Sequence, residues 1–569
     1  MKRIFTAALV LMLLISSLYG QNRSNQSINY DLPEQYVEIV LDSKEEINQI
    51  AADFSVDKVT YIPQNNNYNV RLWLGKRDYD SFESYRIPFS IYKPDNSKWN
   101  ILMADSYAQF VANWNRYPTY SAYLAIMDTF QRRYPDICDI DTILDATPDN
   151  HLILVAHISN TLHENSNKPS FFYTSTMHGD EVAGYYMMIR LIDYILANQN
   201  NPKVQNIINN VDLWICPLEN PDGTYYSGDN QIGESPISIR SNAHYYDLNR
   251  SYPEISLTTT RSYQPEVQAM MDFASAHPFV MSANMHGGAE VYNYPWDCCT
   301  SYESPHPDDS WFWYIGRGFA DTCHTFNSNY FTDLNNGVTQ GADWYTVYGS
   351  RQDYMNYYQH CREVTLEMSA EKVLPNSYLV SYWGYVKNSF LNYIEESLYG
   401  FRGLVTDSIS GEPLAAKVLV NNHDEDLNNT EVYSKLPVGD YHRPIKAGSY
   451  SVTFSAEGYI PKTIAVNVTD RNSSVYNVEL VRVVSVEEYQ KEELVVFPNP
   501  TDDFVMLSSE LAGMNLSATI YSISGELLFS KRIHSNDNKL DFRSYPAGIY
   551  VIKILNENNE IRECKVIKK

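Results

Sequence analysis

The chain has 569 residues, and 43 lysines and arginines stand against 69 aspartates and glutamates, a formal net charge of −26. A chain of this length holds several domains and buries a large core. The acidic balance argues against a nucleic-acid partner, because contact with phosphates requires a basic surface. The seven cysteines include no Cys-x-x-Cys pair, which argues against a thiolate zinc site. Some can pair in an oxidising compartment, but the odd number leaves one over and the connectivity stays open.

The first residues have the features of a secretory signal. Met1-Lys2-Arg3 is basic, residues 4–15 are apolar, and small residues follow up to Gly20. This order predicts a signal peptide over residues 1–20 that is removed on export. We expect no transmembrane segment, since no later apolar run is long enough to cross a membrane.

Residues 21–112 predict a small α+β domain. Short strand-like and helix-like segments follow one another in the order β-α-β-β-α-β, which is typical of a ferredoxin-like fold. These segments are residues 36–41, 44–54, 59–62, 70–74, 77–86 and 89–92.

Residues 113–399 predict an α/β domain with a mixed, mostly parallel sheet flanked by helices. Strands alternate with helices along the chain, and such sheets gather active groups at the strand ends. The predicted strands are 152–158, 171–177, 211–216, 279–285 and 364–368, and the predicted helices are 119–134, 182–198 and 265–276.

Two β-sandwich domains are expected to complete the chain. Residues 400–483 carry short alternating strands separated by glycine, asparagine and aspartate. Residues 484–493 are polar and charged and predict a linker. Residues 494–569 have an all-β pattern again.

The pair His178 and Glu181 joins the end of a predicted strand to the first turn of a predicted helix. An imidazole and a carboxylate at such a junction can point at one Zn²⁺ ion and leave a position open for chemistry. A Glu at a helix N-terminus and a hydrogen-bonded His explain the same pair without a metal. His286, followed by two glycines at the end of another predicted strand, is a candidate third ligand, although alone it is more often a structural histidine.

Two further segments favour the metal site. Arg240 precedes Asp247-Leu-Asn249-Arg250 by seven residues, and Glu367 places an acid inside an apolar strand. A buried charge is costly without a metal, a partner or a function.

Together these segments resemble the zinc metallocarboxypeptidases, and the closer match is the regulatory branch, which carries a transthyretin-like β-sandwich after the catalytic domain. The resemblance covers residues 113–483. It rests on His-x-x-Glu at 178–181, the spacing from Arg240 to Asp-Leu-Asn-Arg, His286-Gly-Gly with Tyr-Pro-Trp-Asp297, and Thr-Leu-Glu-Met-Ser at 365–369. The start of the sandwich at residues 401–413 is similar to that branch as well.

The resemblance implies one zinc ion, held by His178, Glu181 and His286, with Lewis-acid chemistry and a water of lowered pKa. Glu367 is expected to be the general base. Arg240 is expected to stabilise the developing oxyanion. The structural alternative for Glu367 is an ion-pair partner.

Residues expected to bind substrate follow from the same resemblance. Asn249 and Arg250 would hold the C-terminal carboxylate of a peptide, which makes the enzyme an exopeptidase. Asp247 would orient His178 or else cap a loop. Asp297, eleven residues after His286, would receive a Lys or Arg side chain, and the alternative is a turn residue before Cys298-Cys299.

The sequence departs from the family at the mobile tyrosine that covers the substrate. The family places it three residues after the aspartate of a Gln-Asp pair, where this chain has Asn356. A shift of one residue favours Tyr357, with Tyr354 in reserve.

Both ends have resemblances of their own. Residues 36–92 are similar to carboxypeptidase pro-domains, which cover the active-site cleft until proteolysis. Residues 494–569 look like a C-terminal sorting domain of the type IX secretion system, which implies export through the periplasm and outer membrane to the cell surface or medium. A further adhesive β-domain is the alternative for this segment.

The sequence thus predicts a secreted zinc carboxypeptidase that removes C-terminal Lys or Arg from peptides, with peptide C-termini and the type IX machinery as partners. Two other functions remain open. One is a peptide-binding module that has lost catalysis, and the other is a cell-wall peptide amidase. The Asn249-Arg250 clamp argues against an amidase, which has no terminal carboxylate to hold.

Overall fold

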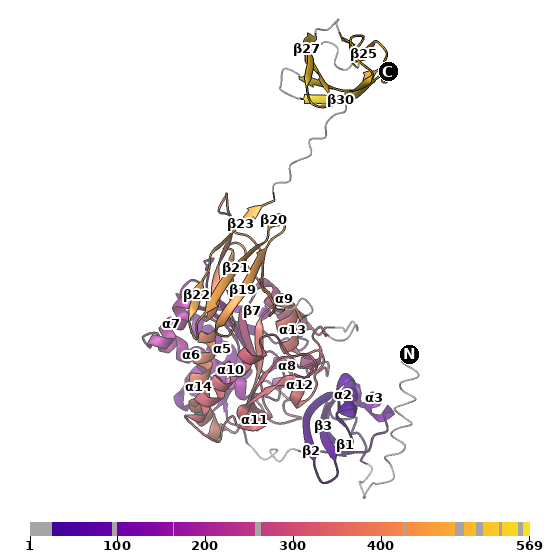
Figure 1. Cartoon of the computed structure of the whole chain (residues 1–569). Helices are drawn as coiled ribbons and strands as arrows, with labels where there is room; N and C mark the ends of the chain where they lie inside the picture. The colour runs from indigo at the N-terminus through magenta and orange to yellow at the C-terminus, as the bar shows by residue number, and fades with distance from the viewer. Residues whose placement is uncertain are drawn as a thin grey trace. The chain divides into compact units, whose positions relative to one another are not determined.

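The computed structural model describes residues 26–93, 100–162, 164–255, 263–424, 428–483, 494–507, 516–533, 538–555 and 561–569. The predicted signal peptide and the predicted linker 484–493 lie outside these residues. The chain divides into two compact units, one up to Arg482 and one from Val483 (Figure 1). Within the described part of the chain, every helix is too short or too polar to cross a membrane.

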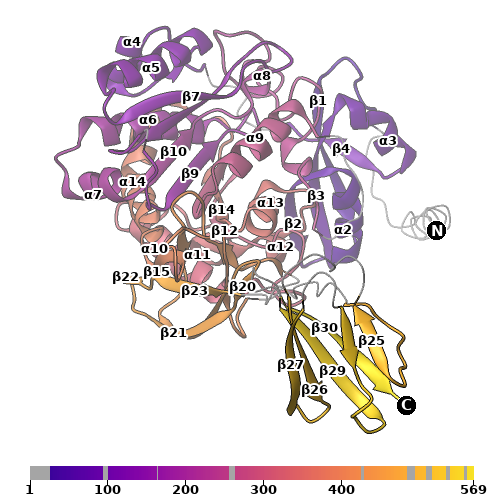
Figure 2. The ribbon, with the colours of Figure 1, turned by 90° about the horizontal axis from the view of Figure 1, so that it is seen from above.

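The first sheet has four strands in the order β2-β3-β1-β4, and all of its pairs are antiparallel. Its elements follow the predicted β-α-β-β-α-β order: β1 (Glu34–Leu41), α2 (Lys44–Asp53), β2 (Ser55–Ile62), β3 (Asn67–Gly75), α3 (Tyr79–Ser84) and β4 (Phe89–Ile91). Inward residues such as Val37, Ile39 and Leu72 form its core with α2 and α3. Strand β2 begins at Ser55, earlier than the predicted start at residue 59, and a register shift against β3 between Val56 and Lys58 interrupts the alternation from which a strand is predicted. Figure 2 shows this sheet together with α2 and α3.

The large sheet has eight strands in the order β13-β12-β14-β11-β9-β10-β8-β7. The central strands β10, β9, β11 and β14 are parallel, whereas β7, β8 and β12 join antiparallel neighbours. The predicted mixed, mostly parallel sheet is confirmed. Its strands are β7 (Cys138–Leu144), β8 (Ile153–Ile158), β9 (Ser170–Ser175), β10 (Asp212–Cys216), β11 (Met281–His286), β12 (Ala289–Tyr294), β13 (Val338–Gln340) and β14 (Arg362–Ser369).

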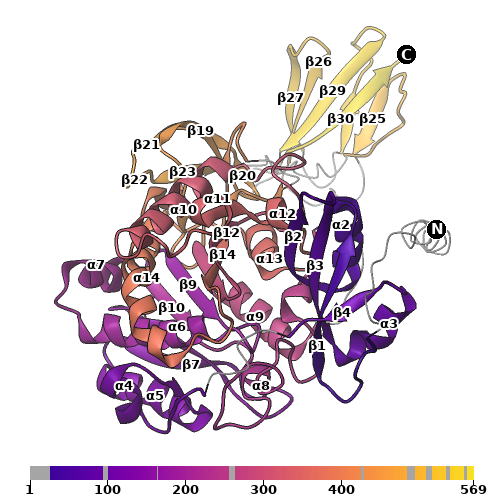
Figure 3. The same ribbon diagram turned by 90° about the horizontal axis from the view of Figure 1, so that it is seen from below.

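Helices cover both faces of this sheet, because alternate side chains along its strands point to opposite faces. On β9, Phe171 and Tyr173 join a core with α5, α6, α10 and α14, whereas Phe172 joins a second core with α9 and α13. Helices α10 and α14 lie side by side (Figure 3). The bounds are α5 (Tyr120–Arg133), α6 (Ala183–Ala197), α9 (Pro265–Ala276), α10 (Asp309–His324), α13 (Arg351–Tyr358) and α14 (Asn376–Glu396).

Shorter elements complete the α/β part. They are β5 (Met103–Ala104), α4 (Tyr107–Asn113), β6 (Tyr117–Pro118), α7 (Pro202–Asn210), α8 (Pro221–Thr224), α11 (Asp333–Gly337) and α12 (Gly341–Trp344).

A two-sheet β-sandwich follows in the same unit, as predicted. One sheet has the order β18-β15-β23-β20 with β22 beside β15, and the other has the order β17-β16-β19-β21. The strands are β15 (Gly400–Asp407), β16 (Lys417–Val420), β17 (Val432–Tyr433), β18 (Asp440–Arg443), β19 (Gly448–Ser455), β20 (Tyr459–Ile460), β21 (Lys462–Val468), β22 (Ser473–Val475) and β23 (Val478–Arg482).

Buried ion pairs join this sandwich to the large sheet. Asp308 accepts from Arg443 of β18 and from Arg362 of β14, each at 2.9 Å. Arg443 also binds Asp424, at 2.6 Å. All four side chains have little or no solvent exposure, so the two domains share one charged core.

The second unit is an all-β domain with two sheets, in the orders β24-β25-β28 and β27-β26-β29-β30. Alternating residues such as Val505, Ile520 and Ile552 form its core. The strands are β24 (Val496–Phe497), β25 (Phe504–Leu507), β26 (Leu516–Ser522), β27 (Leu527–Ile533), β28 (Lys539–Asp541), β29 (Gly548–Leu555) and β30 (Ile561–Lys568).

Candidate metal centre and active site

Three candidate ligands meet at the carboxyl ends of two neighbouring parallel strands. His178 follows β9, and His286 is the last residue of β11, which pairs with β9. Glu181 was expected in the first turn of a helix, but α6 begins at Ala183 with Val182 as its N-cap, so Glu181 lies in the turn before the helix. The parallel register brings the ligands together, because the carboxyl ends of parallel strands lie at one edge of the sheet.

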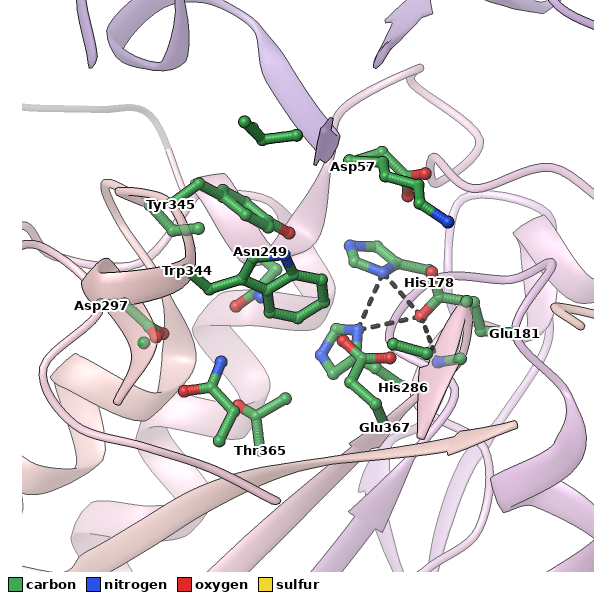
Figure 4. Close-up of a pocket in the computed structure, with 18 of the residues that line it drawn as sticks. Asp57, His178, Glu181, Asn249, His286, Asp297, Trp344, Tyr345, Thr365 and Glu367 are labelled. Carbon is green, nitrogen blue, oxygen red and sulfur yellow. Dashed lines mark hydrogen bonds and ion pairs between the residues drawn. The ribbon is translucent and has the colours of Figure 1, made fainter. Parts of the chain in front are cut away.

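The three donor atoms form a nearly equilateral triangle. His178 Nδ1, His286 Nδ1 and one carboxylate oxygen of Glu181 are each 2.9 Å from the other two (Figure 4). Two imidazole nitrogens that face each other at this distance cannot both carry a proton, so a cation satisfies all three atoms better than hydrogen bonds do. The residues and their arrangement fit Zn²⁺, which takes His nitrogen and carboxylate oxygen at about 2.0–2.2 Å.

The electrostatics around the ligands favour the forms that bind a metal. Burial and the neighbouring His178 lower the pKa of His286 to about 4, so this imidazole is neutral. Burial opposes the charge on Glu181, but His178 and Lys372 outweigh it and hold its pKa well below the usual range. Asp247 contacts His178 Nε2 at 3.0 Å, which leaves His178 Nδ1 directed at the ligand triangle.

Glu367 lies on β14 directly opposite His286 in the β11–β14 register. Its side chain is 9% exposed and points into the same cavity as the ligands (Figure 4). Among the described residues, its Oε2 atom has no hydrogen-bond partner. Burial and then the Glu181 carboxylate raise the pKa of Glu367 well above its usual range. A buried carboxylate with an unused oxygen beside a metal site is suited to accept a proton.

Arg240, Asn249 and Arg250 line this cavity, whose volume is about 230 Å³. Arg240 Nη1 donates to Glu181 at 3.0 Å, and its Nε donates to Asp247 at 3.1 Å. Asn249 accepts the backbone N–H of Arg351 at 3.0 Å, which orients its carboxamide. The structure therefore brings the predicted oxyanion residue and the predicted clamp to the ligands.

Asp297 lines another part of the same cavity and is 4% exposed. Gln352 Nε2 donates to its Oδ1 at 2.9 Å. Burial raises the pKa of Asp297 to about 6, although hydrogen bonds from Ser350 and the charge of Arg250 oppose the rise. Gly341 packs so closely that a Cβ atom there would lie 2.1 Å from Asp297 Oδ1, so any larger residue at this position would displace the carboxylate.

The predicted tyrosine is placed differently. Tyr357 lies outside the group of described residues that line the cavity and packs against Tyr358, with ring centres 4.9 Å apart. Tyr354 is buried in the core with Tyr252. Tyr345 lines the cavity instead (Figure 4). The Gln-Asp spacing points to α13, whereas Tyr345 precedes that helix in a loop, and no spacing rule identified it.

Strand β2 of the N-terminal sheet also reaches the site, as the resemblance of residues 36–92 to pro-domains implies, although the sequence did not show which of its residues make the contacts. Asp57 lies 3.1 Å from Lys372 Nζ and 3.5 Å from Arg240 Nη1. Arg250 Nη2 donates to the carbonyl of Val56 at 2.8 Å. Lys372 in turn binds Glu181 at 2.5 Å. The cationic groups expected to bind substrate are thus engaged by the N-terminal domain.

Comparison with known families agrees with this arrangement. Residues 123–389 match the family described as zinc carboxypeptidase, and that range contains all three ligands and Glu367. This part of the chain belongs to the zinc carboxypeptidase family.

Two curated carboxypeptidases show the extent of the similarity. Mouse (Mus musculus) carboxypeptidase D is 31% identical over 419 residues, covering 70% of this chain and 29% of that protein. Carboxypeptidase E of Caenorhabditis elegans is 27% identical over 406 residues, covering 63% of this chain and 84% of that protein. The chain therefore spans less than a third of the length of the first relative. A solved structure, carboxypeptidase A of Helicoverpa armigera, is 14% identical with a TM-score of 0.48, covering 65% of this chain and 98% of that one.

The second unit matches a different family. Residues 495–569 match the family described as secretion system C-terminal sorting domain. The resemblance expected for residues 494–569 is confirmed.

Proposed function

We propose that the protein is an exported zinc-dependent carboxypeptidase that releases lysine or arginine from the C-terminus of peptides. One observation carries the proposal: a single cavity is lined by the ligand triangle, the unpaired oxygen of Glu367, two arginines and the buried Asp297. A catalytically silent peptide-binding module would not need Glu367 in this position.

The chain's own residues account for the steps of hydrolysis. When bound, zinc supplies Lewis-acid polarisation of the scissile carbonyl. Glu367 takes a proton from the attacking water through its free oxygen and later passes it to the leaving amine. Arg240 donates to the carbonyl oxygen as negative charge develops there, and its fixed contacts to Glu181 and Asp247 hold the guanidinium in place.

Substrate selection rests on two charged positions. Arg250, with Asn249, binds the terminal carboxylate, so that only a chain end fits. Asp297 binds the cationic end of a lysine or arginine side chain, because the cation compensates a buried charge to which Gln352 and Ser350 donate only neutral hydrogen bonds, whereas an apolar side chain does not. The hydrogen bond from Gln352 orients the Asp297 carboxylate for this role, and the absence of a side chain at Gly341 leaves room for it.

The N-terminal domain inhibits the enzyme in this proposal. Asp57 provides a carboxylate to Arg240 and Lys372, and Val56 provides a carbonyl to Arg250. A peptide needs the same donors, so it competes with β2. Cleavage between this domain and the α/β domain would release the site.

Export follows from the second unit. The sorting domain supports delivery by the type IX secretion machinery to the cell surface or medium, where peptide and protein C-termini are available as substrates. The sequence features of residues 1–20 support passage through the periplasm.

The test compares matched blocked dipeptides that end in Arg, Lys or Phe. The full chain is assayed before and after limited proteolysis of the N-terminal domain, with and without a zinc chelator, and beside Glu367→Gln. Chelator-sensitive release of Arg and Lys, lost in the variant, supports the proposal. A preference for the peptide ending in Phe would still support a carboxypeptidase but would contradict the proposed role of Asp297. No release from any substrate after proteolysis favours the binding module.

A further inference from the structure

Two adjacent cysteines next to the cavity have their sulfur atoms in contact. The Sγ atoms of Cys298 and Cys299 are 2.8 Å apart. Neighbouring side chains of an extended chain point to opposite sides, so this contact requires a local backbone that turns both side chains the same way. All seven cysteines belong to the described residues, and each is a free thiol in the structure. Cys298 and Cys299 are thus neighbouring thiols already poised against each other.

Hydrogen bonds on both sides of this pair orient its backbone. Asp353 accepts the backbone N–H groups of Asp297 and Cys298 at 2.8 and 2.9 Å. Gln340 Nε2 donates to the carbonyl of Cys299 at 2.8 Å. Cys298 is buried, whereas Cys299 is partly exposed. The thiol that an oxidant reaches first is therefore that of Cys299.

We propose that Cys298 and Cys299 form a vicinal redox pair that closes to a disulfide after export and fixes the loop that carries Asp297. A hydrogen bond from the Cys298 thiol lowers the pKa of Cys299, which favours its thiolate. The family match of the second unit to a sorting domain indicates export to a compartment in which disulfides persist.

The oxidation balances by thiol–disulfide exchange with a small disulfide such as oxidised glutathione. The Cys299 thiolate attacks one sulfur of the oxidant and releases one thiol, leaving a mixed disulfide. The Cys298 sulfur then attacks Cys299 and releases the second thiol. The two cysteines are oxidised, the oxidant disulfide is reduced, and both cysteine protons end on the released thiols.

The first measurement detects the bond directly in the full chain. After equilibration with oxidised glutathione, the protein is denatured, alkylated and digested with trypsin without reduction. The tryptic fragment that ends at Arg317 begins after Arg261 and contains only these two cysteines. We expect this fragment to carry no alkyl group and to have lost two hydrogen atoms. Two alkyl groups, or a glutathione that stays on Cys299, would overturn the proposal.

Variants separate this pair from the other thiols. Cys298→Ser is expected to retain glutathione on Cys299, because no second sulfur completes the exchange. Cys564→Ser, in β30 of the second unit, should leave the closed fragment unchanged. Closure that persists in Cys298→Ser would mean that Cys299 pairs with a distant cysteine, which overturns the vicinal bond.

The effect of the disulfide on substrate binding at Asp297 rests on the proposed function and is measured separately, by enzyme kinetics. We expect the closed form to have a several-fold lower KM for a peptide ending in Arg than the reduced form, with kcat and the Phe-ending peptide unaffected, since a fixed loop reduces the ordering cost of binding. An equal KM in both forms would refute the link to Asp297. Absence of any hydrolysis would refute the proposed function, while the mass measurement would still decide whether the disulfide forms.

Discussion

Asp57→Asn in the full chain tests whether β2 inhibits the proposed carboxypeptidase activity. The substitution keeps the size of the side chain and removes the charge that contacts Lys372 and Arg240. These two cations keep other partners, Glu181 and Asp247, so the substitution leaves neither of them unpaired. The free energy that holds β2 against the site should therefore fall by the value of about one hydrogen bond between charged groups, about 1.5–3 kcal/mol. At about 1.4 kcal/mol for each factor of ten, the open fraction should rise about 10- to 100-fold.

The assay is the initial rate of arginine release from a blocked dipeptide, expressed as a fraction of the rate after limited proteolysis of the same sample. The uncleaved variant should show an about 10- to 100-fold larger fraction than the unsubstituted chain. Asp42→Asn is the matched control, since Asp42 lies in the same domain on an exposed position outside the cavity lining. An unchanged fraction in Asp57→Asn, with a fully active cleaved sample, would refute inhibition by this contact.

Four further results are expected. Glu367→Gln should lower kcat about 10²- to 10⁴-fold without loss of bound zinc, because it removes the proton acceptor and spares the ligands. Asp297→Asn should lower kcat/KM for peptides ending in Arg about 10- to 100-fold and leave peptides ending in Phe little changed, since it removes one charged contact. Removal of zinc by a chelator should lower Tm by several degrees, and added zinc should restore it, because the ion binds only the folded site. Asp308→Asn should destabilise the first unit by about 3–5 kcal/mol in urea unfolding, because it leaves Arg443 and Arg362 short of a buried anion.

The Asp308 effect has a defined pH dependence. Burial opposes its charge, but Arg443 and Arg362 hold the pKa of Asp308 well below its usual range. A depressed carboxyl pKa contributes stability that is fully present above the unfolded value of about 3.9 and is lost as pH falls through the folded value. The difference between the unsubstituted chain and Asp308→Asn should therefore shrink below about pH 4. A difference that is constant across this range would contradict the ion-pair explanation.

The predictions for Glu367→Gln, Asp297→Asn and zinc removal can each be refuted by one result. Near-normal kcat in Glu367→Gln would remove the general-base role. An equal loss for Arg and Phe peptides in Asp297→Asn would indicate a structural role. A Tm unaffected by chelation would argue against zinc in the ligand triangle.

The sequence predicted the elements that carry a strong periodic signal. Strand 171–177 and helix 265–276 were placed within two residues because their apolar side chains repeat at strand and helix spacing. His178 and His286 were candidate ligands because each stands at the end of such a strand. Here local pattern and the resemblance point to the same positions.

The contacts of β2 could not be predicted in this way. Ser55 and Asp57 flank the buried Val56 at the start of β2, and their side chains contact Asp247 and Arg240 of the α/β domain. A register shift between Val56 and Lys58 then interrupts the alternation of apolar and polar residues. Nothing local distinguishes such residues from solvent-exposed ones, because their partners are distant in sequence. Tyr357 shows the same limit, since a spacing rule places a residue along the chain but does not decide whether α13 reaches the cavity, and none of the described residues of α13 lines it.

The ion pairs around Asp308 have a consequence for how this protein can be divided. Since Arg443 and Asp424 come from the sandwich and Arg362 from β14, a chain truncated near residue 400 would expose a buried arginine and aspartate and lose two of their neighbours. The sandwich and the α/β domain therefore form one structural body, and an unrelated domain could not take the place of the sandwich without disturbing these ion pairs. A substituted sandwich would need to supply a matching positive charge at the position of Arg443, which limits the sequences that can follow this peptidase domain.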